Sequence, residues 1–460
     1  MNLDMLVGLL PEHLLLAGIL ILLVLDLTAL RSSPSLPIPL LAVAAAALAA
    51  LWLAAGDYVA APFPEQFVLD PGRAVAKAVL LGLALPVLLL AGESQSDRRF
   101  AMLLLSSLYG ACLVVSAGSL VTLFLGLELL SLPVYALIVA GSGRPESAEA
   151  ALKYLILGGA GSATLLFGIS LTLGATGSLS MAAFAAAAVS PEPLAVAAVT
   201  LVLVGLMLKA ALVPFHAWAP DAYAGTGIPV TAYMATVIKG AVLLALIGLF
   251  DGARLSPGVV GLTATLALLS AAWGNLAAMA QTGFRRMIAY SSIAHAGFLF
   301  FVLLGEPGGR QEAVVFYVLV YGLANLLAFA CLPPHDDEAT RDHLDRLRGL
   351  YRSRPAAAIL IAVAMLSLAG IPPLPGFVAK FFIFKNVVEA GYTAWAVAGL
   401  LASYLGLFFY LRVIRIMFMD EPVATEAKAH TGVLAGIAGL VCVTAVAAVT
   451  LFPGWLLARL

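Results

Sequence analysis

The chain is 460 residues long, and 63% of its residues are apolar while only 11% are charged. Because ordinary soluble domains carry roughly 25% charged residues, a soluble fold would have to bury nearly the whole chain. The formal charge of −1 at pH 7 offers no broad attraction to nucleic acid. Composition therefore excludes a soluble protein and a nucleic-acid-binding protein, and it indicates a membrane protein.

Long apolar runs follow one another from end to end. A helix of about 20 residues crosses a hydrocarbon core of ~30 Å, and in lipid each run must be helical because no water satisfies an open backbone. We predict about fourteen spans, near residues 5–28, 35–55, 74–92, 99–117, 119–140, 151–174, 194–218, 228–250, 258–280, 286–304, 312–332, 356–384, 392–419 and 431–457. The predicted fold class is an all-α polytopic membrane protein. Since the N-terminus has neither a basic n-region nor a small-residue cleavage site, we expect the first run to be a retained span.

Basic residues orient the predicted bundle, because short cytoplasmic loops carry an excess of Lys and Arg. After odd-numbered spans the chain has Arg31, Arg98, Arg99, Arg144, Arg285, Arg286 and five arginines between 341 and 354. After even-numbered spans it has only Arg73, Lys77, Arg254, Arg310 and Lys385. We therefore expect both termini in the periplasm and the 333–354 loop in the cytoplasm.

Two spans contain prolines where a simple helix would not. The seventh includes Val213-Pro-Phe-His216, and the twelfth includes Gly370-Ile-Pro-Pro-Leu-Pro-Gly376. Proline breaks a helix, and a membrane tolerates such breaks where the backbone lines protein or a wet cavity. Two breaks five spans apart predict two five-helix repeats of opposite topology, with ion sites near the midplane. The predicted division is 1–95 for helices 1–3, 96–252 for the first repeat (helices 4–8), 253–420 for the second (helices 9–13) and 421–460 for helix 14.

A few charges stand near the middle of these spans: Glu128 in span 5, Lys209 in span 7, Lys239 in span 8 and Lys380 just after the break in span 12. A lysine at a helix centre costs about 2.5–3.5 kcal/mol on insertion scales, so such residues must be paired or hydrated. Burial disfavours the charged form of a lysine and a nearby carboxylate favours it. A lysine whose partner approaches or withdraws can therefore carry a proton, and Glu128 is the natural partner of Lys209.

Two histidines and one further lysine each allow more than one interpretation. His295 lies at mid-span in helix 10, where it could relay protons through either ring nitrogen or be a neutral core histidine bonded to a serine. His216, two residues past Pro214, suits a relay or an interfacial polar tip. Lys153 suits a lysine that extends to the interface from a helix end better than the other lysines do. We expect Glu128, Lys209, Lys239, His295 and Lys380, called the axis residues below, to form a hydrated polar axis at mid-membrane.

No cofactor site is apparent in the sequence. Cys112, Cys331 and Cys442 each stand alone inside an apolar run, and there is no Cys-x-x-Cys, P-loop or Gly-x-Gly-x-x-Gly motif. Those motifs are typical of iron–sulfur, metal, nucleotide and flavin sites. We expect no cofactor or metal on this chain, which argues against an independent redox enzyme.

Several long motifs resemble a known family. They are Leu127-Glu-Leu-Leu-Ser-Leu-Pro133, Ser147-Ala-Glu-Ala-Ala-Leu-Lys-Tyr154, Lys209-Ala-Ala-Leu-Val-Pro-Phe-His-Ala-Trp-Ala-Pro-Asp221, Pro229-Val-Thr-Ala-Tyr233, Arg285-Arg-Met-Ile-Ala-Tyr-Ser-Ser-Ile-Ala-His-Ala-Gly297 and Leu368-Ala-Gly-Ile-Pro-Pro-Leu-Pro-Gly-Phe-Val-Ala-Lys380. This pattern, over roughly residues 100–415, is similar to the antiporter-like N subunits of bacterial respiratory complex I, the type I NADH–quinone oxidoreductase. The first three spans and the last match only in hydropathy.

The resemblance implies a proton-translocating subunit of an NADH:quinone oxidoreductase with no redox chemistry of its own. NADH, flavin, iron–sulfur clusters and quinone would be bound by partner subunits. Expected partners are the antiporter-like M and L types, the small K-type subunit, the lipid bilayer of the bacterial inner membrane, protons and buried water. The axis residues fall on the family's key positions, and a lysine at 380 is similar to subunit N and unlike subunit M.

Two other readings remain open. A subunit of a multisubunit sodium/proton antiporter shares the fold and much of the lysine pattern. The Leu130-Ser-Leu-Pro133 and Ser147–Tyr154 stretches favour complex I over it. A scaffold that conducts nothing would keep the same charges as packing pairs, and neutralising Lys209 would then leave proton pumping intact.

Overall fold

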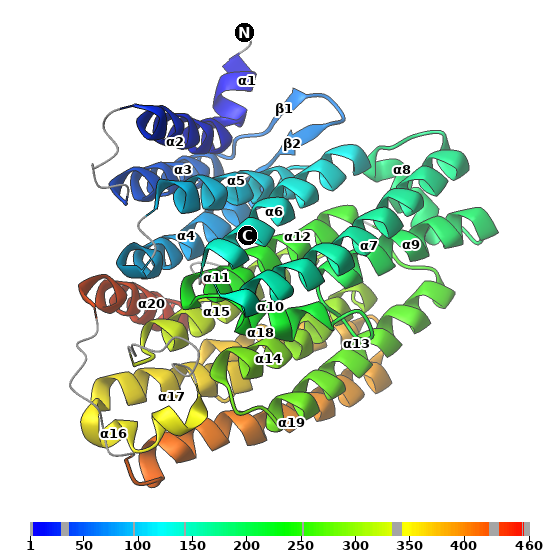
Figure 1. Ribbon diagram of the computed structural model, residues 1–460. Helices are drawn as coiled ribbons and strands as arrows, with labels where there is room; N and C mark the ends of the chain where they lie inside the picture. Colours follow the sequence, from blue (N-terminus) through cyan, green and yellow to red (C-terminus); the bar gives the residue numbers. More distant parts are fainter. Residues whose placement is uncertain are drawn as a thin grey trace.

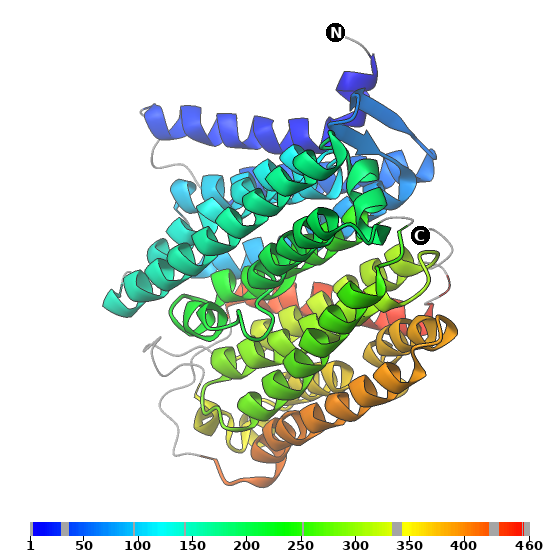
Figure 2. The same ribbon diagram turned by 90° about the vertical axis from the view of Figure 1, so that its right-hand side faces the viewer.

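The structure, a computed structural model, describes residues 3–28, 36–94, 97–141, 144–250, 253–333, 343–422, 432–452 and 454. Arg31, part of the 333–354 loop and the predicted end of the last span lie outside the described residues. The helices lie side by side along roughly one direction (Figure 2). In Figure 1 they follow chain order from the blue N-terminal helices at one end to the orange helix α19 at the other.

The N-terminal part contains a small hairpin as well as helices. Its elements are α1 (Leu3–Gly8), α2 (Leu10–Leu27), α3 (Pro37–Ala55), β1 (Ala60–Phe63), β2 (Phe67–Leu69) and α4 (Pro71–Ser94). The two strands pair antiparallel. The three long helices lie where the apolar runs predict them, whereas the hairpin was not predicted.

The next stretch runs from α5 to α12 and includes the first break. Its elements are α5 (Arg98–Val115), α6 (Leu120–Ala140), α7 (Pro145–Thr176), α8 (Met181–Val189), α9 (Pro193–Lys209), α10 (Trp218–Ala224), α11 (Ile228–Tyr233), the π-helix η1 (Met234–Ile238) and α12 (Lys239–Leu249). Proline at the first or second position begins α7, α9 and α11, where the missing N–H breaks no hydrogen bond.

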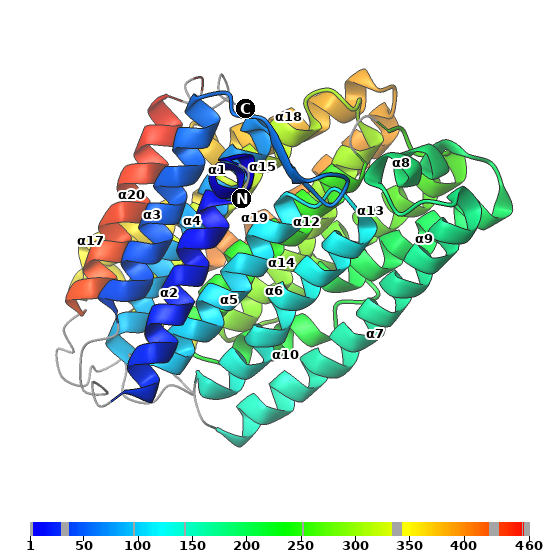
Figure 3. The ribbon, with the colours of Figure 1, turned by 90° about the horizontal axis from the view of Figure 1, so that it is seen from above.

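The last stretch contains the second break. Its elements are α13 (Pro257–Met279), α14 (Phe284–Phe300), η2 (Phe301–Leu304), α15 (Arg310–Ala330), η3 (Leu344–Leu347), α16 (Leu350–Ser353), α17 (Pro355–Ala369), α18 (Pro375–Glu389), α19 (Thr393–Met419) and α20 (Val433–Leu451). The final helix returns to the beginning of the chain, because α20 packs on α4 and α15 (Figure 3).

The membrane fold is confirmed, but the count of fourteen spans is not. Each predicted segment holds a helix. By length and composition, however, twelve helices among the described residues qualify as spans, or thirteen if the pair α8–α9, bent by 117°, counts as one. The apolar helix α17 has only 15 residues, because the break before α18 shortens it. Both predicted breaks are present, between α9 and α10 and between α17 and α18.

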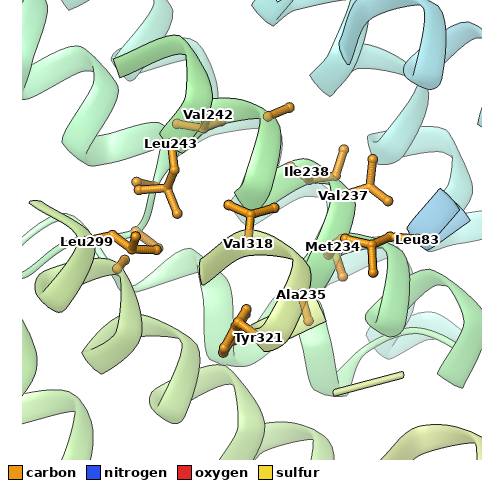
Figure 4. Close-up of a cluster of buried hydrophobic side chains, with 14 of the residues drawn as sticks. Leu83, Met234, Ala235, Val237, Ile238, Val242, Leu243, Leu299, Val318 and Tyr321 are labelled. Atoms are coloured by element: carbon orange, nitrogen blue, oxygen red, sulfur yellow. The ribbon is translucent and has the colours of Figure 1, made fainter. Parts of the chain in front are cut away.

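The centre of the bundle is the segment α11–η1–α12, which is buried from Ile228 to Ile247. Side chains from η1, including Val237 and Ile238, pack with Leu83 of α4 and Val318 of α15 (Figure 4). The π-helix leads directly into Lys239, the first residue of α12. Close packing on all sides therefore fixes the backbone from which one of the axis residues projects.

The charge count used for orientation needs one correction. Several residues that the count places in loops lie within helices, on both predicted sides: Arg73, Lys77, Arg310 and Lys385 on one side, and Arg98, Arg99, Arg285 and Arg286 on the other. One pair on each side is also buried: Lys77 and Arg310, and Arg98 and Arg285. For Arg73 and Lys77 the apolar run does not reveal this, because α4 begins at Pro71, before its hydrophobic stretch.

Candidate functional site

Glu128 and Lys209 form a partly buried ion pair between α6 and α9. Lys209 Nζ donates to Glu128 Oε1 at 2.8 Å, and the Lys209 side chain is only 2% exposed against 23% for Glu128. Ser162 of α7 donates to the same carboxylate oxygen at 2.5 Å, and Ser131 lies 3.4 Å from the Lys209 nitrogen. The lysine charge is thus held by one carboxylate with two hydroxyl groups beside it.

The break after Lys209 is supported by polar contacts from neighbouring segments. Trp218 Nε1 donates to the carbonyl of Leu208 at 3.0 Å, and the Val213 N–H donates to Ser270 Oγ of α13 at 3.0 Å. The Trp218 ring stacks on Tyr154 with 4.1 Å between ring centres. Backbone groups freed by the proline therefore find partners inside the protein, as a break at membrane depth requires.

Lys239 projects from the first turn of α12, directly after the π-helix. Its nitrogen donates to the Ser292 carbonyl of α14 at 3.3 Å, and the residue is 4% exposed. Ser292 Oγ also lies 3.3 Å from the Tyr223 hydroxyl of α10. Short π-helical segments inside α-helices are often found at functional sites, and no sequence pattern predicted this one.

His295 is held by two tyrosines from different helices. Its Nδ1 lies 2.6 Å from the Tyr317 hydroxyl of α15, and its Nε2 lies 3.0 Å from the Tyr410 hydroxyl of α19. Tyr410 in turn lies 2.5 Å from Ser291 Oγ, and the Tyr321 ring packs against the imidazole at 4.7 Å between centres. Both ring nitrogens therefore have hydroxyl partners, and a tyrosine hydroxyl can either donate or accept.

Lys380 lies at the second break, in α18. Its nitrogen donates to the Ala369 carbonyl at the end of α17 at 2.9 Å and to Ser403 Oγ of α19 at 3.0 Å. The terminal carbonyls of a helix lack intrahelical partners and attract cations. Gly370 has a φ of +83°, and a Cβ there would lie 2.9 Å from Lys380 Cδ. A glycine is therefore needed at 370 both for the positive φ of the turn and to leave room for the Lys380 side chain.

Two small cavities flank His295. One is bounded by Lys239 and His295, and the other by His295 and Lys380, while Tyr321 lines both. The remaining lining of both cavities is mostly apolar. His295 therefore lies between the two lysines, with a small cavity on either side of it.

The structure thus arranges the axis residues in two clusters. Glu128 and Lys209 form the first; Lys239, His295 and Lys380 surround the two cavities of the second. Among the described residues, no group of three or more His, Cys, Asp and Glu side chains is arranged to hold a metal ion.

Lys153 and His216 belong to neither cluster. Lys153 is 45% exposed on its side chain and pairs with Glu149 at 2.7 Å and Asp221 at 2.8 Å. Arg286 donates to the other oxygen of Asp221 at 2.8 Å. His216 is half-buried and accepts a hydrogen bond from Trp273 Nε1 at 3.1 Å.

Sequence reasoning missed the polar side chains that hold the axis residues. They are Ser162, Tyr317, Tyr410 and Ser403. Serines and tyrosines are common in membrane helices, so only the spatial arrangement distinguishes these. Sequence reasoning also missed the buried partner of Lys77, which is Glu12.

Comparison with known proteins decides the family. The family model described as NADH:quinone oxidoreductase/Mrp antiporter, TM, matches residues 117–406, a range that includes all five axis residues. The chain belongs to this family. Within the NADH:quinone oxidoreductase/Mrp antiporter family, the NADH-quinone oxidoreductase subunit N of Pelobacter propionicus is 40% identical over 429 residues, which are 93% of this chain and 92% of that relative. Subunit N of Laribacter hongkongensis is 36% identical over 438 residues, 92% of this chain and 89% of the relative.

Solved structures of family members have the same fold. A chain of the respiratory complex I from Thermus thermophilus, solved with bound aureothin, matches with a TM-score of 0.84 and 34% identity over 97% of this chain and 98% of its own. A chain of the Mrp complex from Dietzia sp. matches with the same TM-score of 0.84 but 24% identity, over 100% and 96% of the two chains. The second likeness shows the fold alone.

Proposed function

We propose that this chain is the antiporter-like N subunit of a bacterial NADH:quinone oxidoreductase and that it translocates protons along the axis residues. The observation that carries the proposal is the ion pair between the buried Lys209 and the partly buried Glu128 at a broken helix, with Nζ and Oε1 2.8 Å apart. Relatives named subunit N, 36–40% identical over about nine-tenths of the chain, support the assignment to that enzyme. No redox step is assigned to this chain.

In the proposed mechanism Lys209 is the proton carrier. Glu128 stabilises its charged form while the two are in contact, and withdrawal of the carboxylate favours release of the proton. The proton then passes to the second cluster, where His295 separates Lys239 from Lys380 and can accept at one ring nitrogen while it donates from the other. Tyr223, on the helix after the first break, faces Ser292 beside Lys239 and supports a route between the two clusters.

The assembly and location follow from the same assignment. The expected neighbours are the M- and L-type antiporter-like subunits and the small K-type subunit, with NADH, flavin, iron–sulfur clusters and quinone bound elsewhere in the complex. The expected location is the inner membrane, with both termini in the periplasm. The sodium/proton antiporter remains the second candidate, supported by the shared fold of the Mrp chain but at lower identity than the subunit N relatives.

The test is replacement of Lys209 in the assembled complex. Lys209→Ala removes the titrating group, and Lys209→Arg keeps a charge that cannot be released because arginine stays protonated in proteins. Both changes should abolish or strongly reduce proton translocation coupled to NADH oxidation in membrane vesicles. Glu128→Gln should also impair translocation, since the lysine then loses the carboxylate that stabilises its charge.

A matched control is Lys385→Ala, which removes an exposed lysine paired with its helix neighbour Glu389 at 3.6 Å and should pump normally. Complex assembly is verified for every variant. Near-normal translocation by both Lys209→Ala and Lys209→Arg would exclude Lys209 as the carrier and favour the scaffold.

A further inference from the structure

A second buried ion pair lies outside the axis, among the N-terminal helices. Lys77 Nζ of α4 donates to Glu12 Oε1 of α2 at 2.6 Å, with the two side chains 0% and 1% exposed. The Lys77 nitrogen also lies 4.6 Å from the centre of the Phe67 ring in β2. One lysine side chain therefore joins α2, α4 and the hairpin.

Lys77 is the hydrogen-bond partner of Glu12 among the described residues. The second carboxylate oxygen, Glu12 Oε2, is buried and has no hydrogen-bond partner among the described residues. The position of Glu12 in the first turn of α2 adds a favourable helix dipole. Removing one member of a buried pair leaves an uncompensated charge, whereas replacing both members is often neutral. The closed pair therefore fixes α2 against α4.

Helix α4 connects this pair to the backbone beneath Lys239. Leu80, one turn after Lys77, lies 3.0 Å from the place that a Cβ on Gly240 would occupy. Leu83, a further turn on, belongs to the buried cluster around the π-helix (Figure 4). Since close-packed interiors transmit small displacements, a shift of α4 moves the turn that carries Lys239.

We propose that Glu12 and Lys77 are positioning residues for Lys239. Their ion pair fixes the position of α4, and α4 packs against the π-helical turn that directs the Lys239 ammonium toward the Ser292 carbonyl. The inference rests on the proposed function, because it requires Lys239 to carry protons. The hydrogen bond from Lys239 to the Ser292 carbonyl is already long at 3.3 Å, so a small shift of the turn breaks it.

The experiment compares Glu12→Gln, Lys77→Met and the double variant Glu12→Gln/Lys77→Met in membrane vesicles. The measured quantity is proton translocation per NADH oxidised, normalised to the amount of assembled complex. Each single variant is expected to lower translocation roughly ten-fold, within the loss of about 10²-fold that a 1 Å misplacement can cause. The double variant is expected to recover to within about two-fold of the wild type, because no uncompensated charge remains.

Further variants separate the alternatives. Leu80→Ala leaves the pair intact and removes the contact of α4 with Gly240, so it should reproduce the loss seen in the single variants. Lys385→Met is the control for a lysine exchanged at an exposed site, and it should pump normally. Where a single variant does not assemble, Leu80→Ala decides: normal translocation by that variant overturns the positioning role.

Other outcomes overturn the inference in different ways. Normal translocation per assembled complex in both single variants would mean that the ion pair stabilises the fold and does not position Lys239. A double variant as impaired as the worse single variant would mean that the pair itself carries a proton. Lys239→Met tests the proposed function separately: if it pumps normally, Lys239 is not a carrier, whereas its failure beside normal single variants removes only the positioning role.

Discussion

At the scale of single residues, the second break is shaped by one glycine as much as by its prolines. Gly370 ends α17 with a φ of +83°, and its missing side chain leaves room for Lys380 Cδ and Nζ, which would lie 2.9 Å and 3.2 Å from a Cβ. Lys380 can therefore fold back to the Ala369 carbonyl at 2.9 Å. The glycine determines where the lysine charge rests.

We expect Gly370→Ala to reduce proton translocation by moving Lys380. The backbone strain of an alanine in the left-handed region is about 1–2 kcal/mol, and Gly391→Ala is the matched control because Gly391 has a φ of +88° with nothing within 4 Å of its Cβ position. Both variants should lose similar stability in thermal unfolding, but only Gly370→Ala should lose coupled translocation. Equal translocation by the two would show that the position of Lys380 does not matter.

The tyrosine contacts of His295 lead to a second residue-scale prediction. Tyr317 and Tyr410 hold both ring nitrogens, so the imidazole can receive and pass a proton without turning. We expect His295→Gln, which keeps polar groups but cannot titrate, to reduce translocation on the order of 10²-fold, as loss of a proton-transfer group does. If His295 is instead a neutral core residue, the variant should show altered thermal stability but unchanged translocation per assembled complex.

At the scale of elements, hydropathy predicted helices well and their interruptions only in part. The helix positions and both breaks follow from apolar run length and from proline. The π-helix at Met234–Ile238 and the hairpin of β1 and β2 left no such signal. A π-helix depends on how neighbouring helices pack, and the hairpin is a short connection whose apolar residues resemble those of the spans. The division into two five-helix repeats stays a prediction.

The site, like the helices, could be predicted from the sequence only in part. Isolated charges inside apolar runs pointed to Glu128 and Lys209, because lipid makes such charges expensive. Glu12 and Lys77 escaped notice because each lies within the first two turns of its helix, where a charged residue is ordinarily at the interface. The hydroxyl partners of the axis residues could not be predicted, since they come from helices far apart in the sequence.

The first break yields an element-scale prediction. Ser270 of α13 accepts the hydrogen bond from the Val213 N–H at 3.0 Å, so Ser270→Ala leaves a buried donor without its partner. We expect a loss of about 1–3 kcal/mol, measured as a lower melting temperature of the purified complex. Thr265→Ala in the same helix is the control, because Thr265 is exposed and bonds only to its own helix at Gly261. Equal melting temperatures of the two variants would mean that water replaces the serine.

At the scale of the whole molecule, buried basic residues do not all report on topology. Arg310 is 2% exposed and donates to the carbonyls of Phe250, Ala253, Leu303 and Gly305. Arg310 therefore holds the end of α12 close to the end of η2. Lys77 is held by Glu12. Arg98 and Arg285 of the odd-numbered side are buried as well. With buried residues set aside on both sides, the even-numbered side still has fewer basic residues, so the predicted orientation is unchanged.

The orientation can be tested at two exposed arginines on opposite predicted sides. Arg99, in the first turn of α5, has a side chain 76% exposed and should face the cytoplasm. Arg254, before α13, is 71% exposed and should face the periplasm. The native cysteines Cys112, Cys331 and Cys442 are all buried, so background labelling should be low. A membrane-impermeant maleimide should label Arg254→Cys in intact spheroplasts and Arg99→Cys only in inverted vesicles. Labelling of both from the same side would contradict the topology, and the reversed pattern would place the termini in the cytoplasm.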